Sequence, residues 1–205
     1  MKTTPKATFL TIALLTAACT SSNALAADTA AAPPLTDLLT QLKTESKSAA
    51  DTQLQSLSGD LGSKIQSLTK LLGDNTDAKA QVQGALQSVL GTKSTDALNA
   101  LQKLAEAKLT PEQSKLAAEV RDVASAYLVQ KNFGALEGAQ TDVAQIVSSL
   151  CKGQAAAALP SIKNVAANAK LTQPQKDFLK ALADKYAPAL GKVQESLKSL
   201  PGVGH

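Results

Sequence analysis

Residues 107–127, AKLTPEQSKLAAEVRDVASAY, carry the clearest helix signal in this chain of 205 residues. Thr110 suits an N-cap, Pro111 suits the first turn, and Gln113 stands at the capping-box position. The apolar residues that follow are spaced by three and four positions, as on one face of an α-helix. They are Leu116, Val120, Val123 and Tyr127. The stretch therefore predicts an amphipathic helix with a defined start.

The same helix start recurs later in the chain. Residues 169–175 read AKLTQPQ, so Thr172 and Gln175 repeat the spacing of Thr110 and Gln113 at an offset of 62 residues. We expect a second capping box at Thr172, opening the last helix.

Helical spacing of apolar residues also covers the rest of the chain after residue 34. We expect a leucine-striped helical hairpin over 35–73, broken near Gly59 and Gly62, because glycine costs a helix interior roughly 1 kcal/mol relative to alanine. Ala, Leu, Lys and Gln dominate the composition, and the alternation typical of strands is absent from the sequence. The sequence predicts an all-α fold, a multi-helix bundle that forms a single domain over 35–205.

The recurrence allows two interpretations of this bundle. In the first, two stacked three-helix repeat units, residues 76–131 and 141–199, follow the hairpin. In the second, helices rich in alanine and lysine resemble each other by chance, and the bundle is irregular.

The first 26 residues have the pattern of a secretory signal peptide, with early basic residues, an apolar run and Ala-Leu-Ala at 24–26 as the cleavage site. A flexible linker is expected over 27–34. We therefore expect export to the periplasm or the extracellular space. A second interpretation rests on LTAAC at 15–19, which resembles a relaxed lipobox and would give a lipoprotein anchored at Cys19. A third, a buried N-terminal helix, would make this charge order a coincidence.

Charge and hydropathy argue against a nucleic-acid partner and against a transmembrane span. The chain has 21 basic and 17 acidic residues, and Lys2 and Lys6 belong to the signal peptide, so the mature net charge is small. Because the basic residues form no run and do not alternate with the aromatic ones, no nucleic-acid partner is expected. The mature sequence has no apolar run of the ~20 residues needed to span a bilayer, so no transmembrane span is expected.

The sequence offers only weak candidates for a catalytic or metal site built from histidine or from paired carboxylates. The single histidine is the last residue, His205, so histidine bases and zinc sites are not expected. Glu119 and Asp122 are interpreted as part of a solvated helix face, and Asp74 and Asp77 as a cap of the third helix.

Serine chemistry also lacks support. Ser67 with Lys70 and Ser149 with Lys152 have the spacing found in serine-acylating enzymes, but the companion motifs of those enzymes do not occur. We therefore nominate no catalytic, cofactor-binding or metal-binding residue, and we expect no cofactor.

Cys151 is the one cysteine left after cleavage at the expected site. A disulfide within the mature chain is then excluded. Two interpretations remain: burial as a small apolar side chain, or an intermolecular disulfide in an oxidising compartment. A catalytic thiolate would lack an imidazole partner.

These observations favour an exported, non-enzymatic helical protein that acts through protein–protein contacts, as an adaptor, scaffold or envelope component with an unidentified protein partner. The alternative is a carrier of lipid or another apolar ligand, or peripheral contact with a membrane, because alanine-rich helices leave room for a ligand. An enzyme confined to Asp, Glu, Lys, Ser or Tyr chemistry is the third class.

Overall fold

The computed structural model of this protein describes residues 33–48 and 51–198, with side chains described as far as Ala187 in the last helix. The predicted signal peptide with Cys19, most of the predicted linker and His205 therefore lie outside the described residues.

Within those ranges the backbone forms eight α-helices, one short 3₁₀ helix and no strand, which confirms the predicted all-α helix bundle. The elements are α1 (Leu35–Ser48), α2 (Thr52–Leu71), α3 (Thr76–Leu90), α4 (Ser94–Ala105), α5 (Pro111–Phe133), α6 (Gln140–Cys151), η1 (Ala155–Ala158), α7 (Leu159–Ala166) and α8 (Gln173–Lys198).

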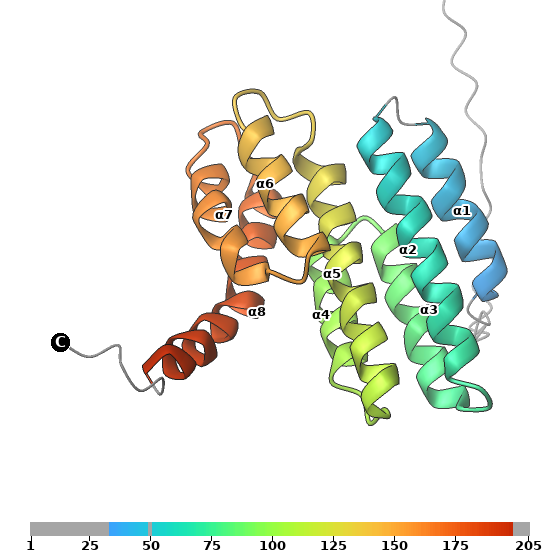
Figure 1. Cartoon of the computed structure of the whole chain (residues 1–205). Coiled ribbons are helices and arrows are strands. Elements are labelled where there is room, and N and C mark those ends of the chain that lie inside the picture. The colour runs from blue at the N-terminus through green and yellow to red at the C-terminus, as the bar shows by residue number, and fades with distance from the viewer. Residues whose placement is uncertain (1–32, 49–50, 199–205) are drawn as a thin grey trace, which may run out of the picture. The chain divides into compact units, whose positions relative to one another are not determined.

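Helix α5 is the helix around which the others gather. It packs against α2, α4 and α6 (Figure 1), and its side chains are buried almost without interruption from Val120 to Gln130. Its predicted start is confirmed: the Gln113 N–H donates to Thr110 Oγ1 at 3.3 Å, and the Thr110 N–H donates to Gln113 Oε1 at 3.0 Å. The two bonds satisfy donors that the first turn of a helix leaves unpaired.

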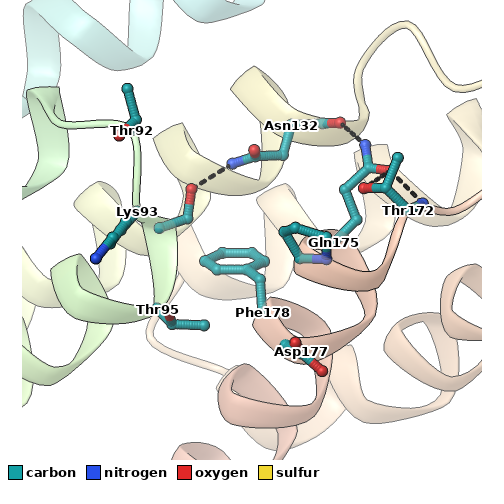
Figure 2. A pocket seen from close by; sticks show the side chains of 10 residues that line it. Thr92, Lys93, Thr95, Asn132, Thr172, Gln175, Asp177 and Phe178 are labelled. Carbon is teal, nitrogen blue, oxygen red and sulfur yellow. Dashed lines mark hydrogen bonds between the residues drawn. The ribbon is translucent and has the colours of Figure 1, made fainter.

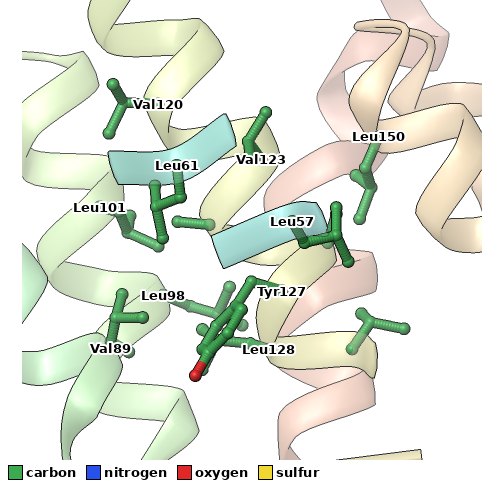
Figure 3. Close-up of a cluster of buried hydrophobic side chains, with 14 of the residues drawn as sticks. Leu57, Leu61, Val89, Leu98, Leu101, Val120, Val123, Tyr127, Leu128 and Leu150 are labelled. Atoms are coloured by element: carbon green, nitrogen blue, oxygen red, sulfur yellow. The ribbon is translucent and has the colours of Figure 1, made fainter. Parts of the chain in front are cut away.

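The core is built from aliphatic side chains of neighbouring helices. Figure 3 shows Leu57 and Leu61 of α2 and Leu98 of α4 beside Tyr127 and Leu128 of α5, and all five are buried. Each buried leucine of this kind stabilises the fold by roughly 1.5–3 kcal/mol.

The predicted break at Gly59 and Gly62 is wrong, because α2 runs through both positions. Gly62 is buried, and a Cβ placed there would lie 3.8 Å from the Leu39 side chain of α1. The stripe that α2 buries outweighs the helix propensity that its two glycines lose. A new helix begins instead after Asp51, whose side chain accepts the N–H groups of Gln53 and Leu54.

Two other predicted helix starts differ in detail. The N-cap of α3 is Asn75, which accepts the Ala78 N–H at 3.0 Å, and not Asp74. At Thr172 only half of the predicted capping box forms: the Thr172 N–H donates to Gln175 Oε1. The Thr172 hydroxyl donates to the same oxygen rather than accepting a backbone N–H.

Gln113 and Gln175, which hold the same position in the recurring motif, each donate a hydrogen bond to a carbonyl of an earlier helix. Gln113 Nε2 donates to the carbonyl of Leu71 at the end of α2, and Gln175 Nε2 donates to that of Asn132 near the end of α5, both at 3.0 Å. The surroundings differ, since α5 packs against α2, α4 and α6, whereas α8 packs against α4, α7 and η1. The three-helix repeat stays a prediction.

Candidate functional site

Three side chains of types that are scarce in this chain, Arg121, Cys151 and Tyr186, line two adjoining hollows. The sequence contains one arginine and two tyrosines, and it has one cysteine after the predicted cleavage site. Arg121 and Tyr186 line one hollow of about 450 Å³, and Cys151 lines an adjoining one of about 390 Å³. We call these the Arg121 hollow and the Cys151 hollow. Asp122 and Gly153 line both.

A hydrogen-bonded cluster forms one wall of the Arg121 hollow. Arg121 donates from Nε and Nη2 to Oδ1 of Asp122, at 2.9 and 2.8 Å. The Tyr186 hydroxyl donates to the same oxygen at 3.0 Å and lies 3.2 Å from Ser125 Oγ. The guanidinium also lies over the Tyr186 ring, 5.3 Å from its centroid, as in a cation–π contact. The cluster therefore joins α5 to α8.

Asp122 corrects an expectation from the sequence. It was predicted on a solvated face, yet only 9% of it is exposed. Glu119 pairs with another helix: its Oε2 accepts from Lys64 Nζ of α2 at 2.7 Å. Helix α5 is covered on several sides, so Asp122 meets Tyr186 of α8, whereas Glu119 pairs with α2 at the surface, with 41% of its side chain exposed.

The Tyr186 hydroxyl and the Arg121 guanidinium are held in their ordinary protonation states. Burial, followed by the charge of Asp122, raises the pKa of Tyr186, so its hydroxyl remains protonated. Burial acts to lower the pKa of Arg121, but Tyr186 and Asp122 together raise it, so the guanidinium remains charged.

The turn after α6 brings the other wall into place. Gly153 has a φ of 67°, a conformation that side chains disfavour, and its N–H donates to the Leu150 carbonyl. The chain then enters η1, which packs against α8. As a result, Ala155, Ala156 and Ala157 line the Arg121 hollow together with Tyr186.

Cys151 is exposed, so its interpretation as a buried side chain is wrong. Partial burial and then the carboxylates of Asp60 and Asp122 raise the pKa of its thiol, against an opposing effect of Lys64. The thiol is therefore mostly protonated at neutral pH and is a weak nucleophile. An intermolecular disulfide through Cys151 stays a prediction.

The Cys151 hollow has an excess of positive charge. It is lined by Lys64, Lys115 and Lys152 and by two carboxylates. Glu119 is paired with Lys64, and Asp122 with Arg121. Lys115 and Lys152 have no ion pair among the described residues. The hollow is thus lined by Cys151 and by two lysines that have no ion pair within the part of the chain that the structure describes.

A further hollow of about 480 Å³ lies where α4 begins and α5 ends, beside the start of α8 (Figure 2). Asn132 Nδ2 donates to Ser94 Oγ, and Gln175 Nε2 donates to the Asn132 carbonyl, each at 3.0 Å. The Phe178 ring lines the hollow and packs against Phe133, with centroids 5.9 Å apart. The side chains of Ser94, Asn132 and Gln175 therefore hold α4, α5 and α8 together through these hydrogen bonds.

Tyr127, the other tyrosine, belongs to the core. It is fully buried (Figure 3), and its hydroxyl has no hydrogen-bond partner in the part of the chain that the structure describes. Burial, with a smaller effect of Glu45, raises the pKa of Tyr127 to about 12. The side chain contributes packing and not reactivity.

The Ser-x-x-Lys pairs show no serine–lysine hydrogen bond. Ser67 Oγ donates to the carbonyl of Ser63 within its own helix, and Ser149 Oγ accepts from Gln145 at 3.4 Å. Lys70 and Lys152 are exposed.

The described residues contain neither a membrane-spanning helix nor a metal-binding cluster. No helix there is both long and apolar enough to cross a bilayer. No group of three or more His, Cys, Asp or Glu side chains there could hold a metal ion.

No known protein family, curated protein or solved structure matches this chain.

Proposed function

We propose that this chain is an exported, non-enzymatic helical protein that acts through contact with a protein partner, as an adaptor, scaffold or envelope component. The gathering of Arg121, Cys151 and Tyr186 around two adjoining hollows carries the proposal. Arginine and tyrosine are the side chains most enriched where interfaces concentrate their binding energy. Arg121 is the single arginine of the chain, and a quarter of its side chain stays exposed in the hollow, which supports this surface as the contact site.

The protonation states at this surface support binding rather than catalysis. The Cys151 thiol and the Tyr186 hydroxyl both have a raised pKa, so neither is activated as a nucleophile near neutral pH. Arg121 and Asp122 are paired with each other and hold a fixed geometry. Such a cluster offers a rigid, charged wall to a partner.

A second candidate function is a carrier for an apolar ligand. The observation that favours it is the row of alanines, Ala155 to Ala157, on the Arg121 hollow. A neighbouring hollow of about 400 Å³ continues from Ala156 to Leu159 and Pro160. Charged groups border both hollows, Arg121 in one and Lys163 in the other, which favours a protein partner over a lipid tail.

The exposed thiol allows a direct test. A maleimide photocrosslinker attached at Cys151 should give one discrete protein adduct in envelope extracts, and excess unlabelled protein should suppress it. The partner is then identified by mass spectrometry, and its affinity is measured with purified proteins.

The matched control moves the crosslinker to an exposed position on another helix, in a Cys151→Ser chain carrying Lys43→Cys, and should give no such adduct. Extracted lipid that raises the melting temperature on re-addition, with no adduct from either position, would contradict the proposal and favour the carrier.

A further inference from the structure

We infer that the paired hollows bind an acidic peptide segment, with a carboxylate held between Lys115 and Lys152 and a neighbouring apolar side chain against Ala155 to Ala157. This inference rests on the proposed function and names the chemistry of the partner.

The charge of the Cys151 hollow determines the first part of the recognition. Lys64 is already paired with Glu119, so its ammonium is largely neutralised. Lys115 and Lys152 are exposed and line the same hollow, and neither has an ion pair among the described residues. A carboxylate that contacts both lysines would neutralise one of their two positive charges.

The Arg121 hollow determines the second part. Four of its lining residues, Gly153 and Ala155 to Ala157, have small side chains or none, and Tyr186 lines it as well. Arg121 is fixed by two hydrogen bonds to Asp122, both on one carboxylate oxygen, and only a quarter of its side chain is exposed. An aliphatic side chain can therefore enter beside the guanidinium without breaking the pair.

Because the two hollows adjoin, a peptide fits them better than a simple inorganic anion does. They share Asp122 and Gly153, so a carboxylate in one and an apolar group in the other must belong to neighbouring parts of one ligand. Successive side chains of an acidic peptide meet this requirement. A simple inorganic anion would occupy only the Cys151 hollow, close to the carboxylate of Glu119.

The test uses a fluorescein-labelled peptide in which glutamates flank a leucine, and a matched peptide with glutamine in place of glutamate. Fluorescence anisotropy with the mature protein should show at least tenfold tighter binding of the acidic peptide, and added salt should weaken it. Carbodiimide coupling, followed by mass spectrometry, should join its carboxylates to Lys115 or Lys152.

The variant Lys115→Gln/Lys152→Gln should weaken the acidic peptide about tenfold. A control of equal charge change, Lys43→Gln/Lys103→Gln, removes two exposed lysines outside both hollows and should change the affinity less than about twofold. Ala157→Trp should fill the Arg121 hollow and weaken the leucine peptide, yet leave a peptide with glycine in place of leucine unaffected. Far-UV circular dichroism checks that each variant is folded.

Equal affinity for the acidic and glutamine peptides, or coupling at lysines outside the Cys151 hollow, would overturn this inference. Binding of inorganic phosphate in competition with the peptide, at similar concentrations, would also overturn it and show a general anion site. A partner captured from Cys151 that is insensitive to both lysine substitutions would leave the proposed function standing and remove only the acidic-peptide chemistry.

Discussion

The hydroxyl of Tyr186 lies 3.0 Å from Oδ1 of Asp122 and joins α8 to α5 across 64 residues of sequence. Both side chains are nearly buried, at 5% and 9% exposure. A hydrogen bond to a buried carboxylate contributes more than a neutral one, because the carboxylate would otherwise lose the solvation it had in water.

Tyr186→Phe should therefore destabilise the protein by about 1.5–3 kcal/mol. The substitution removes the donor to Asp122 and the contact with Ser125 while it keeps the ring under Arg121. Urea denaturation of both proteins measures the difference. An unchanged midpoint would show that water replaces the hydroxyl at no cost.

Tyr127→Phe should not destabilise the protein, in contrast to Tyr186→Phe. The Tyr127 hydroxyl is buried and has no partner among the described residues, so its removal should leave stability unchanged or raise it by about 1 kcal/mol. The two tyrosine-to-phenylalanine variants form a matched pair, measured in the same denaturation series. A clear loss of stability in Tyr127→Phe would reveal a hydrogen bond to that hydroxyl.

The same residue predicts a response to alkaline pH. Because the pKa of Tyr127 is raised from 10.0 to about 12 in the fold, its contribution to stability is complete below pH 10. That contribution is lost as the pH rises toward about 12. Wild type should thus lose stability over this range more steeply than Tyr127→Phe, as followed by circular dichroism. Parallel curves for the two proteins would contradict the assignment.

Asp51 should make the stability of the fold depend on pH in the acid range. Burial acts to raise the pKa of Asp51, but hydrogen bonds from Gln130 Nε2, at 2.6 Å, and from the N–H groups of Leu54 and Gln53 lower it overall. A lowered pKa stabilises the fold at neutral pH, and this stabilisation is lost as the pH falls through the folded pKa, below about 4.

Asp51→Ala should cost about 1 kcal/mol at pH 7, because it removes the N-cap of α2. Asp51→Asn keeps a capping oxygen and should retain most of that stability while flattening its dependence on acid pH. Thermal melts between pH 3 and 7 measure both effects. Identical acid profiles for Asp51→Asn and wild type would assign the acid response to other carboxylates.

The predictable part of this fold is local. Spacings of three and four residues around Leu57, Leu61 and Val120 predict which helix faces are buried. The Thr110 capping box predicts where α5 begins. The break expected at Gly59 failed because the propensity of one residue is small beside the packing of a whole helix. The Asp122 contact was not predictable from local spacing.

The candidate site escaped prediction because its members are far apart in sequence. Asp122 looks solvated on a helical wheel, since only the position of α8 reveals that Tyr186 covers it. Cys151 looks apolar beside Leu150, yet it is exposed as the last residue of α6. One sequence signal was present: Arg121 is the single arginine of the chain and adjoins an acid.

Leu182 offers a test of core packing around α8. It is fully buried, and Leu182→Asp should destabilise the protein by several kcal/mol, because an unpaired charge would replace an apolar side chain. Lys180→Asp on the same helix places the same carboxylate at an exposed position and should change stability by less than about 0.5 kcal/mol. Similar melting temperatures for the two variants would mean that this face of α8 is not part of the core.

Processing at the N-terminus follows from the competition between two sequence motifs. The Ala-Leu-Ala stretch at 24–26 matches a signal-peptidase site, whereas LTAAC at 15–19 has threonine where a lipobox usually has leucine. The exported protein should therefore begin at Ala27, carry no acyl chain and contain one thiol, Cys151. Intact mass spectrometry of the envelope fraction, before and after labelling with a maleimide under denaturing conditions, measures the start, any acyl chain and the number of thiols. A mass that includes an acylated Cys19 would instead give a membrane-anchored lipoprotein, and its acyl chain would then hold the paired hollows near the membrane surface.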